Sequence, residues 1–255
     1  MNKLPRCLVA AAFMLAVLPT AYAAGEGAIE EALASPVRTD ADRERDKRDK
    51  PLEVLEFAGF GKGMLIADVF GGGGYYSEIL SVVVGDQGEV LLVNNAPYDT
   101  YVKAELTARL ANDRLANVRY LLVSNEALGL GSDRLDGALI IMSYHDLFYD
   151  DPDNNWPDVG HDQFIDQIVS ALKPGGRLLI VDHAAKPGTG GDETQRLHRI
   201  DEQFAKAELT RRGLVFVGSM QGLRNSEDDR SISVFDPAIR GKSDRFVHLY
   251  KKPIG

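Results

Sequence analysis

Short apolar runs alternate with stretches of helical spacing from residue 64 to the end of the chain. The runs that predict strands cover residues 64–70, 89–93, 118–123, 135–142, 177–181, 214–220 and 245–251, and the predicted helices among them cover residues 75–84, 101–115, 163–172 and 201–212. Strands that are apolar throughout, without an alternating polar face, are typical of a parallel sheet covered on both sides. This alternation of strand and helix predicts an α/β fold with an open, doubly wound, mostly parallel sheet and helices on both faces.

The last two predicted strands have no helix between them, so we expect the final strand to run antiparallel to its neighbour. They are separated by residues 224–244, a polar segment that is rich in both charge signs. Loops of this length are usually functional or disordered. Three cations of the segment could bind an acidic acceptor, namely Arg240, Lys242 and Arg245. Local ion pairing with Asp46 and Asp49 is the favoured interpretation, because mixed charges close together usually neutralise one another.

Ahead of the predicted sheet the chain is mostly polar. Residues 39–50 alternate both charge signs densely, which is typical of a solvated helix or arm supported by neighbouring ion pairs. Pro51 then opens an apolar-spaced segment, residues 52–57, which predicts a helix that ends at Gly59. Residues 25–35 indicate a short, loosely held lead-in.

The first 23 residues have the layout of a secretory signal peptide. Lys3 and Arg6 precede an apolar run over residues 7–18, and Ala21 and Ala23 supply the small residues that an exporting peptidase reads. The run is too short for a stable membrane-spanning helix. We therefore predict a signal peptide (1–23), a charged arm (24–50) and one α/β domain (51–255). Cleavage is expected after Ala23. The cleaved protein would be periplasmic or secreted and would not insert stably into a membrane. An uncleaved anchor or a soluble N-terminal helix remains the alternative.

Charge and cysteine content narrow the class of partner. The formal net charge is −9, and loss of Lys3 and Arg6 with the signal would bring it to −11. A surface this acidic disfavours nucleic acid as a partner and leaves a small molecule as the expected one. The single cysteine, Cys7, lies in the signal segment, so the exported chain would have neither disulfides nor a cysteine nucleophile.

Four consecutive glycines, residues 71–74, join the first strand to the helix that follows it. A turn at the carboxyl end of a parallel strand is where open α/β sheets bind ligands, and glycine allows a close approach of the backbone. Asp68 just before the turn suits a ligand with a positive charge better than a pyrophosphate. A dinucleotide is the lesser interpretation, because Ser77 stands where a third glycine is expected and Asn94 where an acid is expected. A tight turn without any ligand is the other alternative.

Several motifs together resemble one enzyme family. The stretch ADVFGGGGYY (67–76) and the stretch LKPGG (172–176) before a strand look like those of the class I S-adenosylmethionine-dependent methyltransferases. More narrowly, the chain resembles a group of exported, predicted methyltransferases. The matching stretches are RDKRDKP (45–51), VDHAAKPG (181–188), LHRID (197–201) and FDPAIRGKSDRF (235–246), which together span nearly all of the chain after the signal segment.

The resemblance implies a seven-stranded sheet with an antiparallel last strand, and S-adenosylmethionine bound over the glycine turn as cofactor. The residues that the resemblance assigns to cofactor binding are Asp68, Gly72 and Gly74 at the methionine end, Asn94 at the ribose, and Asn125 or Glu126 near the adenine. Independently of the resemblance, Tyr75 directly after the turn could pack over the cofactor, with a place in the core as the alternative. Two positions depart from the wider family. Phe70 occupies the first glycine position of the turn, and Asn94 replaces the acid that holds the ribose hydroxyls.

The best candidates for chemistry follow the fourth predicted strand. Tyr144 is expected beside the cofactor, while His145 next to Asp146 could accept a proton from a nucleophilic oxygen or nitrogen. His198 is expected to line the same pocket. A structural histidine on a loop, or a helix cap in the case of His198, is the alternative. An Asp and His cluster could instead hold a metal, but the spacing carries no metal signature and we predict no metal ligand.

The sequence thus favours a methyltransferase that acts on an unidentified small or medium acceptor. The alternative is a catalytically weak, methyltransferase-like ligand-binding protein of the cell envelope. Export motivates this alternative, since S-adenosylmethionine is made in the cytoplasm, and Phe70 and Asn94 are compatible with it.

Overall fold

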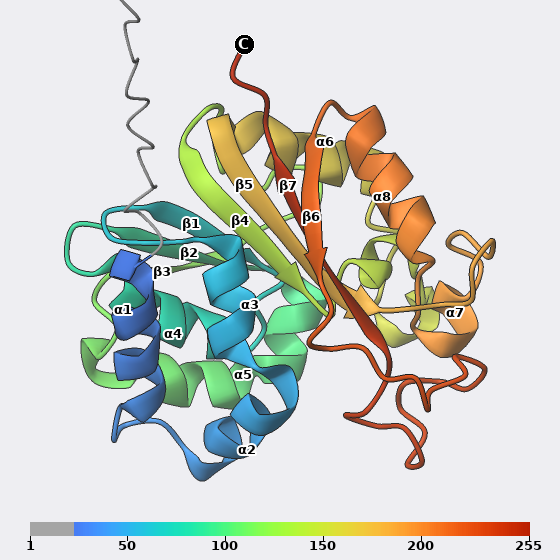
Figure 1. Ribbon diagram of the computed structural model, residues 1–255, viewed down its shortest axis with the longest axis horizontal. Coiled ribbons are helices and arrows are strands. Elements are labelled where there is room, and N and C mark those ends of the chain that lie inside the picture. The colour runs from blue at the N-terminus through green and yellow to red at the C-terminus, as the bar shows by residue number, and fades with distance from the viewer. Residues whose placement is uncertain (1–22) are drawn as a thin grey trace, which may run out of the picture.

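The computed structural model describes residues 23–255, so the predicted signal segment before Ala23 lies outside the described range. A seven-stranded sheet of order β3-β2-β1-β4-β5-β7-β6 runs through the centre of the molecule (Figure 1). The strands are β1 (Leu65–Val69), β2 (Glu89–Asn94), β3 (Val118–Leu122), β4 (Leu135–Ile141), β5 (Leu172–His183), β6 (Val215–Met220) and β7 (Arg245–Lys251). The α-helices are α1 (Ala23–Ala34), α2 (Asp40–Asp49), α3 (Pro51–Ala58), α4 (Tyr75–Val84), α5 (Ala96–Leu110), α6 (His161–Ala171), α7 (Thr194–Leu197) and α8 (Glu202–Arg211).

The strand directions confirm the predicted fold class. β3, β2, β1, β4 and β5 pair in parallel in that order. β7 lies between β5 and β6 and is antiparallel to both. The sheet is therefore doubly wound and mostly parallel, and the last strand of the chain is antiparallel, as the sequence predicts.

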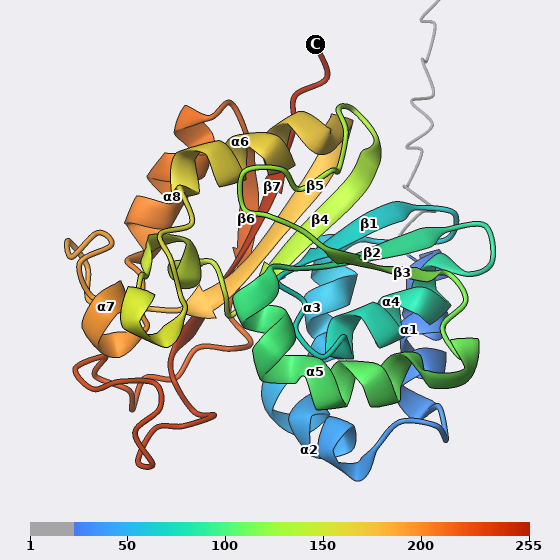
Figure 2. The same ribbon diagram turned by 180° about the vertical axis from the view of Figure 1, so that it is seen from behind.

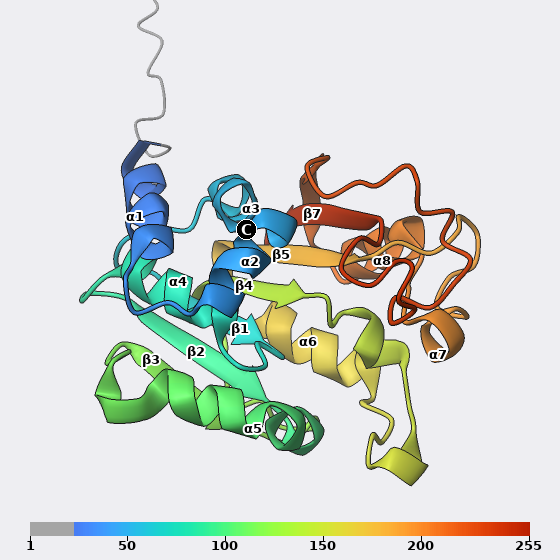
Figure 3. The same cartoon turned by 90° about the horizontal axis from the view of Figure 1, so that it is seen from below.

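Two hydrophobic layers cover the sheet, because successive residues of each strand face opposite sides. On one side, Ile66 of β1 and Leu179 of β5 pack against helices α1, α3 and α4. On the other side, Val69 of β1 and Ile180 of β5 pack against α6 and α8. Figures 2 and 3 show these layers, with α5 crossing the end of the sheet where β1 and β2 finish. Strands buried on both faces explain the apolar runs of the sequence.

The lead-in predicted over residues 25–35 is wrong. The segment belongs to helix α1, whose Ile29 and Ala32 are buried in the hydrophobic cluster that α1 forms with α3 and α4. The charged segment after it does form a helix, α2, which begins with a capping box between Thr39 and Asp42. α2 is not simply solvated, since Asp42 and Asp49 are buried against the domain.

The polar segment 224–244 has no helix or strand of its own, yet buried ion pairs hold it. Arg199, which is fully buried, binds the Asp228 carboxylate through both terminal nitrogens at 2.8 and 3.1 Å. Val234 and Ile239 of the segment are also buried. The segment is therefore ordered against the end of β5 by these contacts. Within residues 23–255, no helix has the length and apolarity needed to cross a membrane.

Candidate active site

The glycine turn between β1 and α4 has a backbone that side chains would disrupt. Gly72 and Gly74 have φ of 58° and 81°, in the left-handed region that favours glycine. A Cβ on Gly71 would lie 2.5 Å from Leu92 Cδ1 and 2.6 Å from the Asp68 carboxylate. The four glycines therefore fold the chain tightly around the end of β1, which brings backbone atoms next to Asp68.

Asp68 is a fully buried carboxylate at the end of β1. It accepts a hydrogen bond from Ser77 Oγ of α4 at 2.7 Å. Burial raises the pKa of Asp68 to about 6, because the charged form loses its hydration and the bond from Ser77 offsets only part of that loss. The group is poised to gain from a cation placed beside it.

Asn94, at the end of β2, braces the turn. Its Nδ2 donates to Gly72 O and its Oδ1 accepts from Gly72 N–H, both at 3.0 Å, and the residue is fully buried. The neighbouring Asn95 donates to Asn125 Oδ1 at 3.0 Å, and Glu126 is exposed. Asp68, Gly72, Gly74 and Asn94 are thus brought together, with Asn125 at the next strand end and Glu126 further out.

The first turn of α5 covers the space between the ends of β1 and β4. The Tyr98 ring stacks on the Phe70 ring with centroids 4.6 Å apart, and its hydroxyl donates to Asp146 Oδ2 at 2.5 Å. Val102 of the same helix lies over Gly72, 3.6 Å from where a Cβ would be. Phe70 itself has φ of 52°, uncommon for a residue with a side chain and typical of strained functional sites.

A buried hydroxyl close to Tyr98 has no hydrogen-bond partner among the described residues. Ser143, after β4, is buried, and its Oγ lies near Tyr98 without a hydrogen bond of ordinary geometry to any described residue. Buried polar groups normally have a partner. Ser143 Oγ therefore has unused hydrogen-bonding capacity just after β4, the strand that pairs with β1.

Arg109 of α5 ties the turn to α2. Its Nε donates to Gly73 O at 2.7 Å, and its terminal nitrogens bind Asp42 at 2.8 Å and also Glu78. Although burial opposes the shift, hydrogen bonds from Arg109 and Thr39 lower the pKa of Asp42 to about 2. The Arg109, Asp42 and Glu78 side chains are all about 5% exposed, so the cluster is a buried ion network.

The side chains of Tyr75 and Tyr144, which were expected at the cofactor, pack against other parts of the protein. The Tyr75 hydroxyl donates to Asp46 at 2.5 Å and Arg45 lies 4.0 Å from its ring centre, so its side chain serves the contact between α4 and α2. Tyr144 is fully buried in the core, with its ring 5.7 Å from that of Phe148. The side chains of both tyrosines are part of the packing.

The residues expected to carry chemistry gather at the ends of β4 and β5. Asp182 holds His145 twice, accepting from its backbone N–H at 2.6 Å and pairing with its Nδ1 at 2.8 Å. The other ring nitrogen, Nε2, lies 3.1 Å from Asp146 Oδ1, and His198 Nδ1 lies 3.8 Å from the same oxygen. His145, Asp146 and His198 are therefore neighbours.

Their surroundings set different proton affinities for the histidines. Although burial opposes it, the carboxylates of Asp146 and then Asp182 hold the pKa of His145 well above its usual value. The pKa of His183 lies well below its usual value, because the residue is buried and the charge of His145 repels a second one. These surroundings favour the charged form of His145 and the neutral form of His183.

A small cavity of about 280 Å³ opens beside His183. Arg48, Arg240 and Arg245 line it, together with Met142 after β4. Arg245 donates to Asp49 at 2.8 Å, so the pairing of this arginine with α2 is confirmed, while Arg240 is exposed. The cavity is basic and fits a small group with negative charge.

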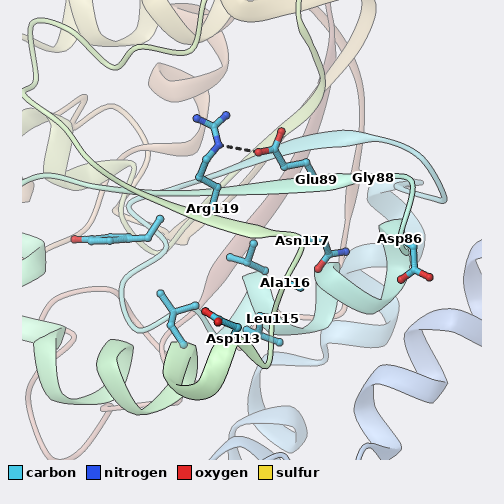
Figure 4. A pocket seen from close by; sticks show the side chains of 11 residues that line it. Asp86, Gly88, Glu89, Asp113, Leu115, Ala116, Asn117 and Arg119 are labelled. Atoms are coloured by element: carbon cyan, nitrogen blue, oxygen red, sulfur yellow. Dashed lines mark hydrogen bonds and ion pairs between the residues drawn. The ribbon is translucent and has the colours of Figure 1, made fainter.

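A larger cavity lies at the wrong end of the sheet for this chemistry. It measures about 700 Å³ and surrounds the beginnings of β2 and β3, with Asp86, Glu89, Asn117 and Arg119 on its walls (Figure 4). Arg119 pairs with Glu89 at 2.7 Å. Ligands of open α/β sheets bind at the opposite, carboxyl ends of the strands, so the candidate site remains at the glycine turn.

Tyr98 and Arg109 were missed in the sequence analysis. Both lie on α5, whose start was expected at residue 101, although Asn95 and Pro97 are an N-cap and first-turn proline that place it at Ala96. That local signal would have brought Tyr98 into the helix. Nothing in the sequence marks its contact with Asp146, which depends on how α5 lies across the sheet.

No family model matches the chain. Among curated proteins, it is similar to the ubiquinone/menaquinone biosynthesis C-methyltransferase of Shewanella oneidensis, with 27% identity over 129 residues. The match covers 51% of this chain and 46% of the relative, so the chain spans about half the length of the curated relatives it matches.

Solved structures of similar fold cover most of the chain. A SAM-dependent methyltransferase from Aquifex aeolicus has a TM-score of 0.58 at 18% identity, with 89% of this chain and 97% of that chain covered. The [4+2]-cyclase SpnF has a TM-score of 0.54 at 16% identity, with 94% and 98% covered. The chain therefore has the fold of the class I S-adenosylmethionine-dependent methyltransferases.

Proposed function

We propose that this protein is an S-adenosylmethionine-dependent methyltransferase that acts on a small acceptor. The observation that carries the proposal is the buried Asp68 carboxylate beside a glycine turn, at the strand end where proteins of this fold bind their ligand. The similarity to a C-methyltransferase over half of the chain supports methyl transfer over simple ligand binding. That relative's acceptor is not carried over, since the match covers less than half of its length.

The chain's own residues would bind and align the reactants. S-adenosylmethionine, when bound, supplies an activated methyl group on a sulfonium. Asp68 would attract the cationic end, Gly72 and Gly74 would let the backbone approach, and Ser143 Oγ would gain a hydrogen-bond partner. Because positioning is the main task in such a transfer, the burial of this crevice and the exclusion of water from it are the protein's principal contribution.

The acceptor would lie on the β4–β5 side, next to the histidines. His183 lines the basic cavity with its Nδ1 2.7 Å from Ser243 Oγ, and its neutral form would serve as the base for an acceptor bound there. His145, fixed between Asp146 and Asp182, would serve as a positive charge near the reacting atoms rather than as the base. The cavity size and its arginines favour a small acceptor with an acidic group.

Calorimetry followed by a turnover assay tests the proposal. Purified protein should bind S-adenosylmethionine in a saturable manner and form S-adenosylhomocysteine when supplied with small acidic acceptors. Absence of binding by folded protein contradicts the proposal. Binding without turnover across many acceptors would instead support the ligand-binding protein of the cell envelope.

Tyr98 provides a test of how the cofactor enters. Replacing Tyr98 with Phe keeps the stack on Phe70 but removes the hydrogen bond to Asp146, which is a bond to a charged acceptor. Such a bond is worth about 1.5–3 kcal/mol. If the closed position of α5 competes with the cofactor, Tyr98→Phe should bind S-adenosylmethionine faster and roughly 10-fold more tightly in stopped-flow and equilibrium titrations. An affinity equal to or below that of wild type would show that Tyr98 is not a competitor.

Export is a further part of the proposal. The layout of residues 1–23 supports it, although residues 1–22 lie outside the described range. We expect the protein purified from its native envelope to begin at Ala24, which intact-mass and N-terminal peptide measurements would read directly. A native N-terminus at Met1 with the chain in the cytoplasm would contradict export.

A further inference from the structure

The cluster of His145, Asp146 and His198 has the composition and spacing of a cation-binding site. Two carboxylates, Asp146 and the fully buried Asp182, flank one imidazole on opposite sides. The nearby arginines are already paired, Arg199 with Asp228 at 2.8 Å and Arg245 with Asp49 at 2.8 Å. Nε2 of His145 lies 3.1 Å from Asp146 Oδ1, and either a proton on Nε2 or a metal ion that takes the place of that proton satisfies this contact.

The ligand atoms are spaced as a metal would require. His145 Nε2, one Asp146 oxygen and one His198 ring nitrogen all lie within 4.8 Å of one another. Two ligand atoms that each lie about 2.0–2.1 Å from a tetrahedral zinc ion are about 3.3 Å apart. The 3.1 Å and 3.8 Å separations from Asp146 Oδ1 bracket that value. A small rotation of the His198 ring would complete the set.

The remaining contacts resemble the outer shell of a metal centre. A histidine that binds a metal usually donates its other ring nitrogen to a carboxylate, which fixes the tautomer, and Asp182 does this for His145 at 2.8 Å. Tyr98 donates to Asp146 Oδ2, which leaves Oδ1 free to face the two histidines. The backbone of His198 has a φ of 52°, a strained conformation for a residue with a side chain.

The side chain of His198 is 19% exposed and that of Asp146 12%, so one side of the cluster is open to solvent. A set of two imidazoles and one carboxylate with an open position is the pattern of catalytic zinc and related first-row divalent ions. We propose that His145 Nε2, Asp146 Oδ1 and His198 Nδ1 bind one divalent transition-metal ion, with Zn²⁺ as the model ion. This site does not depend on the proposed methyl transfer.

Metal binding can be measured without any assay of activity. Chelator-treated, dialysed protein is titrated with Zn²⁺ by calorimetry, its metal content is determined by elemental mass spectrometry, and Co²⁺ replaces Zn²⁺ for visible spectroscopy. We expect about one Zn²⁺ per chain, a rise in the unfolding midpoint with Zn²⁺, and Co²⁺ bands typical of nitrogen and oxygen ligands. Mg²⁺ should give none of these, since it prefers all-oxygen ligands.

The variant His198→Gln should weaken Zn²⁺ binding by at least about 10-fold and abolish the rise in unfolding midpoint, as should Asp182→Asn through the loss of its hold on His145. The matched control is His161→Gln, since His161 belongs to the more exposed group with Asp162 and Glu208. Circular dichroism confirms that each variant is folded. The proposal is overturned if folded wild type does not bind Zn²⁺ saturably, or if His198→Gln binds as wild type does.

Discussion

Replacing Asp68 with asparagine is expected to weaken S-adenosylmethionine binding by roughly 10- to 100-fold, the worth of one hydrogen bond or contact to a charged group. The side chain keeps its size and can still accept from Ser77 Oγ. Isothermal titration calorimetry at pH 8 measures the loss. The variant Ser77→Ala, which removes only the neighbouring hydroxyl, serves as the matched control and should have a much smaller effect.

The same substitution should not destabilise the fold at pH 8. The pKa of Asp68 is about 6 in the folded chain against 3.8 for the free side chain, so burial of the ionised form costs up to about 3 kcal/mol. The asparagine side chain adds an N–H donor that needs a partner, which offsets part of the stability gained by removing the buried charge. We expect an unfolding midpoint equal to or above that of wild type, together with the loss of binding.

The pH dependence has a defined sign. A carboxyl group whose folded pKa is raised contributes stability below about pH 4 and loses that contribution as the pH rises through about 6. Wild type should therefore gain stability relative to Asp68→Asn as the pH falls from 6 to 4. A variant that unfolds more easily at pH 8 and binds the cofactor normally would show that Asp68 is only structural.

Replacing Arg109 with methionine is expected to destabilise the protein by about 3–5 kcal/mol, because it leaves Asp42 and Glu78 buried without their shared cation. Denaturant unfolding measures the change. The matched control is Arg119→Met, which breaks an exposed pair with Glu89 and should cost at most about 1 kcal/mol.

The loss should be concentrated in the contact of α2 with the glycine turn. Limited proteolysis is expected to cut Arg109→Met between α1 and α3 before the rest of the domain opens. In wild type, the pKa of Asp42 is lowered to about 2, so this contact contributes stability above about pH 4 and loses it as the pH falls toward 2. A variant as stable and as resistant to protease as wild type would show that the network does not hold α2.

The fold could be predicted well from residue 64 onward, for a simple physical reason. Strands covered on both sides must be mostly apolar, and β1, β2 and β4 are predominantly apolar runs. The contact between His145 and Asp182 could also be predicted, since His145 follows β4 and Asp182 lies at the end of the neighbouring parallel strand β5, although the two residues are 37 positions apart.

What the sequence could not reveal depends on contacts between distant polar residues. The sequence of helix α2 indicates a solvated helix, because its charged residues have no hydrophobic pattern. In the structure, however, Asp42 pairs with Arg109, 67 residues away, and Asp49 pairs with Arg245, 196 residues away. His198 lies next to Asp146 and has a left-handed backbone conformation, which no residue pattern in the sequence predicts. Tyr98 lies over Phe70 because of the path of α5, which only tertiary packing sets.

A crystal structure of the protein with S-adenosylhomocysteine would show whether the glycine turn binds the cofactor. We expect the nucleoside at the glycine turn, its amino group within hydrogen-bonding distance of Asp68, and the Tyr98 ring displaced from Phe70. A structure with Tyr98 still stacked on Phe70 and the nucleoside absent, or bound away from β1, would contradict this expectation.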